Sequence, residues 1–236
     1  TFALGRLVEA WQLLTGAIEA CQKNHFSDIL AQLYNLQGEI QQTLLDFPAA
    51  ALSYQKSLED QKIAFNTFSV LGRLGYMEGL SGHLETGLAL IDKAIAGAKQ
   101  VGTESMVLHA RFYRASLLLP HQDVRPELTA VIEEAERRGY ADTAIKTRFH
   151  LLQRSLDLDP QVDHHIEARA VKERIWQSKS PWLQVEYLAW MARASQHRHL
   201  GPEKEELRSL LQQLSPDTAD KHLQALFKNY CQQMLR

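Results

Sequence analysis

The stretch from Leu71 to Ile95, LGRLGYMEGLSGHLETGLALIDKAI, constrains the fold more than any other part of the chain. Its pattern predicts one helix, a short turn and a second helix. Small residues stand among the bulky apolar ones, at Gly75, Gly82, Gly87 and Ala94. Two helices pack closely only where small side chains let their backbones approach. We therefore interpret this stretch as a tightly packed helical hairpin.

The same spacing of small and large residues occurs in two earlier parts of the chain. After Gly82, a small residue follows five positions later, a large residue nine later and a small residue twelve later. The same offsets recur in two upstream blocks, Gly5–Ala10–Leu14–Ala17 and Leu45–Ala50–Tyr54–Ser57. The blocks begin at residues 5, 45 and 82, so the period is about 37–40 residues, which indicates a repeated helix–turn–helix unit.

These units resemble the tetratricopeptide repeat (TPR). The best unit matches at Tyr34, Gly38, Phe47, Ala50, Tyr54 and Ser57, and the next at Leu71, Gly75, Gly82, Leu84, Gly87, Ile91 and Ala94. The match is good over residues 1–100 and degenerate over 101–236, and Gln37 and Gly87 replace the usual Leu and Ala. The resemblance implies an α-α superhelix of about five to six antiparallel helix pairs. It also implies a concave groove that binds a peptide or partner protein.

Composition favours an all-α chain, because helix formers dominate and β-branched residues nowhere alternate with polar ones. We expect about twelve helices with short connections, which makes 1–236 a single TPR-like domain. Helix N-caps are expected at Asp46, Asp123 and Ser180, and a left-handed C-cap at Gly139. The last two helices are expected to start at Gly201-Pro202 and Ser215-Pro216.

Charge and cysteine usage exclude several classes of protein. The formal net charge of −2 gives no general attraction to nucleic acid or to an anionic membrane. No apolar run approaches the roughly 20 residues of a membrane span, and no signal peptide is recognisable. Cys21 and Cys231 lie far apart and form no CxxC motif. This usage fits a reducing compartment, so we expect a cytoplasmic protein.

The two ends of the array carry separate predictions. The helix from about Leu7 to Lys23 has the pattern of a second repeat helix without a first. It would expose an apolar stripe, formed by Leu7, Trp11, Leu14 and Ile18. We expect that the chain was cut from a longer protein with another helix upstream; the alternative is that this helix simply caps the array. The last helix is expected to cap the C-terminal end, and homo-oligomerisation through the solenoid ends is a further hypothesis.

No set of residues predicts catalysis, so we expect neither an enzyme nor a cofactor. The pairs His164-His165 and His197-x-His199 are interpreted as surface or capping residues, because a metal site needs several converging ligands. Neither cysteine has a partner pattern typical of a nucleophile. The clusters 133–138 and 203–206 mix charges at helical spacing and are interpreted as solvated faces with i,i+4 pairs.

The groove is the remaining candidate site. In TPR-like arrays the first helix of each pair lines the concave face. The repeat register turns these residues towards it: Gln32, Asn35, Glu39 and Gln42, then Ser69, Gly72, Tyr76 and Gly79, then Ala110, Tyr113 and Leu117. The amides would hold a peptide backbone, and Tyr76 and Tyr113 its side chains. Co-chaperone TPRs grip a C-terminal carboxylate with Lys and Asn, but the corresponding positions here are Asn35 and Glu39, so that clamp is absent.

The leading hypothesis is therefore a protein–protein interaction module. Its resemblance to the degenerate arrays of bacterial signalling and regulatory proteins implies that it is the regulatory or scaffolding part of a larger signalling protein. The alternative is a sensor of a small ligand or peptide signal that regulates an attached ATPase, kinase or transcription regulator. Tyr76, Tyr113 and Arg111 would then line its pocket. An open groove favours protein partners, whereas a closed, aromatic-lined pocket favours a small molecule.

Overall fold

The computed structural model describes residues 6–60, 64–158, 165–194 and 201–235. Within these ranges the chain forms twelve helices and no strand, which confirms the prediction of an all-α helical solenoid. The first six are α1 (Leu7–Asn24), α2 (Ser27–Thr43), α3 (Phe47–Asp60), α4 (Ala64–Leu80), α5 (Leu84–Gln100) and α6 (Glu104–Leu118). The others are α7 (Arg125–Arg137), α8 (Ala141–Leu158), α9 (His165–Ser178), α10 (Pro181–Ala194), α11 (Gly201–Leu214) and α12 (Lys221–Met234).

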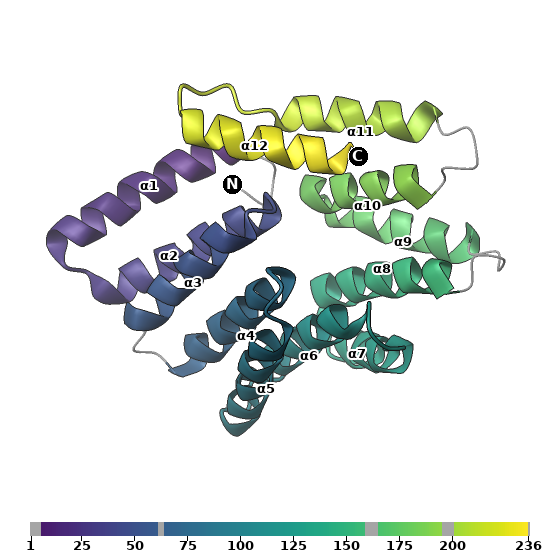
Figure 1. Ribbon diagram of the computed structural model, residues 1–236, viewed down its shortest axis with the longest axis horizontal. Helices are drawn as coiled ribbons and strands as arrows, with labels where there is room; N and C mark the ends of the chain where they lie inside the picture. The colour runs from purple at the N-terminus through teal and green to yellow at the C-terminus, as the bar shows by residue number, and fades with distance from the viewer. Residues whose placement is uncertain (1–5, 61–63, 159–164, 195–200, 236) are drawn as a thin grey trace.

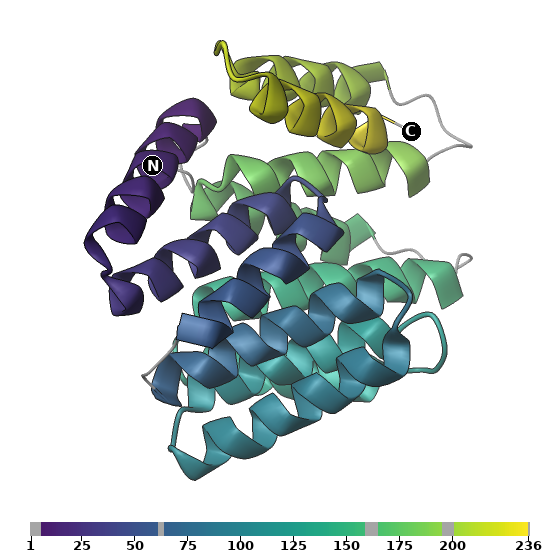
Figure 2. The same cartoon turned by 60° about the vertical axis from the view of Figure 1, so that its left-hand side comes forward.

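Neighbouring helices pack as hairpins, and the hairpins stack in chain order (Figure 1). The even-numbered helices also touch one another: α4 packs on α6, and α6 on α8. The array curves as it proceeds, so that α12 comes to lie beside α1 (Figures 1 and 2). No helix among the described residues has the length and apolar character needed to cross a bilayer.

The hairpin of α4 and α5 is held by a direct approach of two backbones. A Cβ atom on Gly75 would lie 2.6 Å from the carbonyl oxygen of Gly87, and one on Gly87 would lie 2.5 Å from that of Gly75. Gly82 forms the turn with a φ of 98°, in the left-handed region. The preceding hairpin uses a related contact, in which Gly38 lies under the ring of Tyr54. The predicted packing role is confirmed for Gly38, Gly75 and Gly87, whereas Gly82 has no neighbour within 4 Å and serves the turn.

Several predicted helix ends agree with the structure. The Asp46 carboxylate accepts a hydrogen bond from the Ala49 amide (3.3 Å), and the Ser180 hydroxyl accepts one from the Leu183 amide (3.4 Å). Gly139 follows α7 with a φ of 77°. These contacts satisfy backbone groups that a helix end leaves unpaired.

Two predicted helix starts were wrong. The last helix begins at Lys221 rather than at Ser215-Pro216, because the carboxylate of Asp220 accepts the amides of His222 (2.9 Å) and Leu223 (3.0 Å). A carboxylate at a helix N-terminus also meets the positive end of the helix dipole. Likewise Val124, not Asp123, is the N-cap of α7; Asp123 accepts the backbone amide of Arg125 instead.

The two ends of the array share one apolar cluster. The stripe of α1 is buried, with exposed fractions of 2% at Leu7 and 6% at Trp11. It belongs to the same cluster as Leu223, Phe227 and Tyr230 of α12. The apolar stripe that suggested an upstream helix is thus covered by the chain's own C-terminal helices.

A polar contact adds to this closure. The indole Nε1 of Trp11 donates a hydrogen bond to the carboxylate of Asp220 at 3.1 Å, and the Trp11 ring lies 5.9 Å from that of His222. Asp220 therefore both caps α12 and joins it to α1. The curved array is closed into a ring at this point (Figure 1).

Gly75→Ala should lower the free energy of unfolding by about 1–3 kcal/mol, because the added methyl group meets backbone rather than a yielding side chain. Gly16→Ala is the matched control. Its Cβ would have no neighbour within 4 Å, so the gain in helix propensity should stabilise the protein by up to ~1 kcal/mol. Urea unfolding followed by circular dichroism measures both; a stabilised Gly75→Ala protein would contradict the close approach.

Trp11→Phe should lose about 1–2 kcal/mol of stability, because it removes the bond to Asp220 and part of the buried surface. Amide hydrogen exchange should speed up in both α1 and α12, although only α1 is changed. Trp190→Phe is the control, since Trp190 is similarly buried (8% exposed) but packs on Phe149 and Tyr187. Faster exchange confined to α1 in the first variant would argue against closure.

Candidate binding groove

Three first-of-pair helices form an open pocket. It has a volume of about 320 Å³ and lies between α2, α4 and α6. Its lining residues are Gln32, Asn35, Leu36, Asn66, Ser69, Val70 and Met106. In both α2 and α4 they follow the i, i+3, i+4 spacing that places side chains on one helix face. The predicted groove residues Gln32 and Asn35 therefore line this pocket.

Asn35 has one buried polar atom without a hydrogen-bond partner. Its Nδ2 donates to Glu39 Oε1 at 3.1 Å, which fixes the orientation of the amide. Its Oδ1 is buried and has no hydrogen-bond partner among the described residues. A buried acceptor without a donor costs about 1–3 kcal/mol. This oxygen is closed to solvent, so it lies behind the surface of the pocket.

Glu39 and Gln42 act within the fold. The carboxylate of Glu39 pairs with the guanidinium of Arg73 at 3.0 Å, and both side chains are about two-thirds covered. Gln42 does not line the pocket; its Oε1 accepts the hydroxyl of Tyr54 at 2.8 Å. Desolvation acts to lower the pKa of Arg73, but Tyr113 and Glu39 outweigh it, so the pKa rises and the charge is kept. The charges of Glu39 and Arg73 thus neutralise each other, and the polar groups of Gln42 and Tyr54 satisfy each other within the fold.

The two predicted groove tyrosines stack on each other. The ring centroids of Tyr76 and Tyr113 lie 4.8 Å apart with an angle of 18° between the planes. Burial is the main cause that raises the pKa of Tyr76. The cavity between α4 and α6 that includes Tyr113 and Arg73 holds about 20 Å³, room for about one water molecule. The tyrosines therefore fill space between helices rather than line an empty pocket.

Two histidines extend this polar interior towards α8. His109 Nδ1 lies 3.0 Å from the Ser105 carbonyl oxygen and its Nε2 lies 2.9 Å from the Thr143 hydroxyl, which fits a neutral ring that donates from Nδ1. His150 Nδ1 lies 3.3 Å from the Ser116 hydroxyl. Burial lowers the pKa of His109 to about 4, with Arg73 the next cause.

The second ring behaves in the same way. Burial and then the charge of Lys146 lower the pKa of His150 to about 4. Both histidines are therefore neutral at pH 7 and join α6 to α8. Glu186 of α10 lies in the same interior, where burial raises its pKa and Lys146 acts against that rise.

Several residues of this face were not predicted, although the sequence carries a signal for three of them. Asn66 stands three positions before Ser69, Arg73 four after it, and Met106 four before Ala110. Each therefore shares a helix face with a residue that the repeat register already placed in the groove. Lys146 and Glu186 lie beyond residue 100, where the degenerate repeats gave no register.

The other candidate residues do not assemble into a chemical site. His164, His197 and His199 lie outside the described residues, as does the side chain of His165. Among the residues that the structure does describe, no group of three or more His, Cys, Asp or Glu is placed to hold a metal ion. Cys21 is buried and Cys231 partly buried, and both are free thiols.

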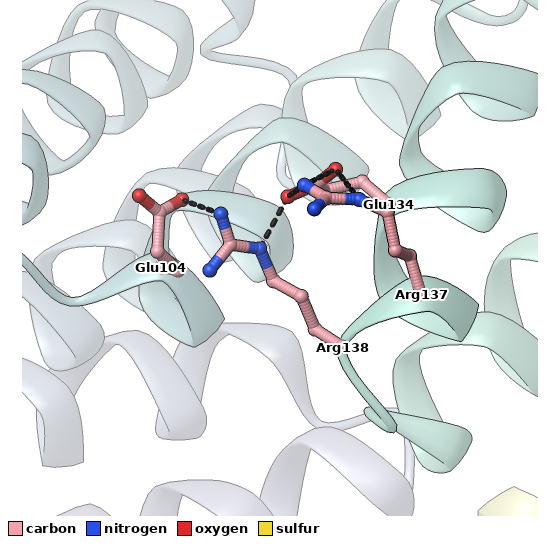
Figure 3. Close-up of polar contacts among 4 residues, drawn as sticks. All are labelled: Glu104, Glu134, Arg137 and Arg138. Carbon is pink, nitrogen blue, oxygen red and sulfur yellow. Dashed lines mark hydrogen bonds and ion pairs between the residues drawn. The ribbon is translucent and has the colours of Figure 1, made fainter.

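The charged stretch at the end of α7 is a solvated face, as interpreted from its spacing. Glu134 pairs with Arg137 and with Arg138, and Arg138 reaches Glu104 of α6 at 3.7 Å (Figure 3). Hydrogen bonds from Arg137 and then Arg138 lower the pKa of Glu134 to about 2. Glu136 adds links to Arg148 and Arg174. These pairs join neighbouring hairpins, and none of their residues lines the pocket between α2, α4 and α6.

No protein-family model matches this chain, and a comparison with curated proteins gives no match. The function is therefore inferred from the groove and its neighbouring residues.

The buried histidines predict a pH dependence. The unfolded chain binds protons at His109 and His150 near pH 6.5, whereas the folded chain does so only near pH 4. The free energy of unfolding should therefore fall as the pH falls through this window. A His109→Gln, His150→Gln variant should show a shallower slope between pH 6.5 and 4 in urea unfolding. The exposed His121→Gln is the control and should keep the wild-type slope; an unchanged slope in the double variant would refute the assignment.

Proposed function

We propose that this chain is a binding module, a TPR-like array that holds an extended segment of a peptide or partner protein in the pocket between α2, α4 and α6. The observation that carries the proposal is the amide lining of that pocket, to which Gln32, Asn35 and Asn66 contribute. The N–H and C=O groups of an extended backbone are the partners that such amides bind.

The composition of the pocket suits an uncharged, extended segment. Gln32 and Asn66 offer amide donors and acceptors beside Asn35, as a peptide backbone with alternating N–H and C=O groups requires. Leu36, whose exposed fraction is 47%, and Met106 supply apolar surface for a side chain. No charged residue lines the pocket, and the nearby Arg73 is already paired with Glu39. Recognition would therefore rest on backbone hydrogen bonds and apolar contact.

The repeat register supports the TPR-like part of the proposal. The mutual approach of Gly75 and Gly87, and of Gly38 and Tyr54, occurs at the positions through which the chain resembles the family. By that resemblance, the array would serve as the scaffolding or regulatory part of a larger signalling protein. The two free cysteines fit a cytoplasmic setting.

The small-ligand sensor hypothesis receives less support. This hypothesis requires a closed pocket that Tyr76, Tyr113 and Arg111 line. The two tyrosines stack on each other, and Arg111 pairs with Glu127 at 2.8 Å. An open pocket lined by amides favours a peptide instead.

A display selection of random peptides on residues 1–236 tests the proposal. Selected peptides should bind an Asn35→Ala, Asn66→Ala double variant about thirtyfold more weakly, since the two lost hydrogen bonds together are worth about 2 kcal/mol. Fluorescence anisotropy gives the dissociation constants. The matched control is Asn24→Ala, Asn229→Ala, which removes two exposed amides elsewhere. Equal affinity for both double variants would exclude this pocket as the binding site.

A further inference from the structure

A second pocket lies on the last hairpin, away from the α2/α4/α6 pocket. It has a volume of about 500 Å³ and runs between α11 and α12. Its principal lining residues are Arg208, Leu211 and Gln212 of α11 and Gln224, Phe227 and Lys228 of α12. On both helices these follow an i, i+3, i+4 spacing, so one continuous face of each helix forms one wall of a groove.

The stacking of the array indicates what shape fits this groove. Earlier in the chain, the hairpin of α4 and α5 receives the next helix, because α6 packs on both of its members. α10 packs on both α11 and α12, and α1 joins α12, but neither α10 nor α1 contributes a described residue to the lining of this groove. Each of its two helices has 14 residues, which corresponds to a length of about 21 Å. The groove is therefore long enough to hold a helix of about four turns.

The floor of this groove is apolar. Leu211 and Phe227 are buried, with exposed fractions of 4% and 5%, and contribute to its base. Leu235, at the end of the groove, is 51% exposed. A helix that presents apolar residues at i, i+3, i+4 and i+7 would cover this surface.

The rim is basic. Arg208 and Lys228 are exposed, stand on opposite walls and form no ion pair with a described residue. Among the described residues that line the groove there is no carboxylate. This differs from the rest of the array, where Arg111, Arg138 and Arg148 each pair with a glutamate. The positive charges of Arg208 and Lys228 are therefore available to pair with acidic residues of a partner.

We propose that the groove between α11 and α12 binds an amphipathic helix of a partner protein, with apolar residues on one face and acidic residues along its two edges. The apolar face lies on Leu211 and Phe227, and the acidic edges meet Arg208 and Lys228. This site is independent of the α2/α4/α6 pocket. Together they would give the array two binding surfaces for two kinds of partner segment.

Two labelled peptides test the proposal. Each is an 18-residue capped helix with Leu at the i, i+3, i+4 and i+7 positions, one with Glu at its edges and one with Lys. Fluorescence anisotropy with the whole 236-residue chain should show that the Glu peptide binds about tenfold more tightly than the Lys peptide. An Arg208→Glu, Lys228→Glu variant should reverse this preference. The control, Lys93→Glu, Lys99→Glu, makes the same change of charge at exposed positions of α5 and should keep it.

Cys231 gives a readout at the site itself, because it lines the groove and is a partly buried free thiol. Saturating Glu peptide should slow its alkylation by iodoacetamide at least fivefold at pH 8.5, measured by mass spectrometry, whereas Cys21 is buried elsewhere. Equal binding of both peptides, an unchanged preference in the Arg208→Glu, Lys228→Glu variant or unprotected Cys231 would overturn the proposal. Oleate binding at the groove without peptide binding would also overturn it, in favour of a small anionic amphiphile. None of these results bears on the Asn35 pocket.

Discussion

The close approach of Gly75 and Gly87 is the constraint on which the rest of the array depends. With a carbonyl oxygen 2.5–2.6 Å from where a Cβ would stand, the two helices meet backbone to backbone. This separation determines how the next hairpin stacks, because the next helix, α6, rests on both members of the pair. Along the array, α4 packs on α6 and α6 on α8, so these first-of-pair helices lie side by side. The pocket of Asn35 thus results from packing at positions far from it.

Two groups of residues can be distinguished around the groove: those that would contact a bound segment, and those that hold the helices in place. Glu39, Arg73, Gln42 and Tyr54 satisfy one another, and the neutral histidines bond to hydroxyl groups of neighbouring helices. Buried polar groups of this kind cost little when every partner is present, and they specify one arrangement of the helices. Against this background the buried Oδ1 of Asn35 is distinctive, because it lacks the partner that its neighbours have.

The sequence contained enough to predict the helices and hairpins, because the small–large–small spacing is local and a steric requirement preserves it. It also put Gln32 and Asn35 on one helix face, since helical periodicity determines a face, and both line the same pocket. It did not separate Asn35, which faces an open pocket, from Gln42, which bonds to Tyr54, because that difference depends on contacts between helices. The start of α12 was missed for a similar reason. Ser215-Pro216 has the local pattern of a helix start, but Asp220 caps the helix and also binds Trp11 of α1.

The contact between Trp11 and Asp220 joins residues 209 positions apart. An open solenoid behaves as a linear series of units coupled only to their neighbours, so it can lose its terminal units one at a time. Joining the ends changes that behaviour, because each terminal helix then has a neighbour on both sides. The joint can form only after the intervening repeats have assembled, and such long-range contacts slow folding. The chain therefore combines locally determined hairpins with a final step that makes their unfolding a single cooperative event.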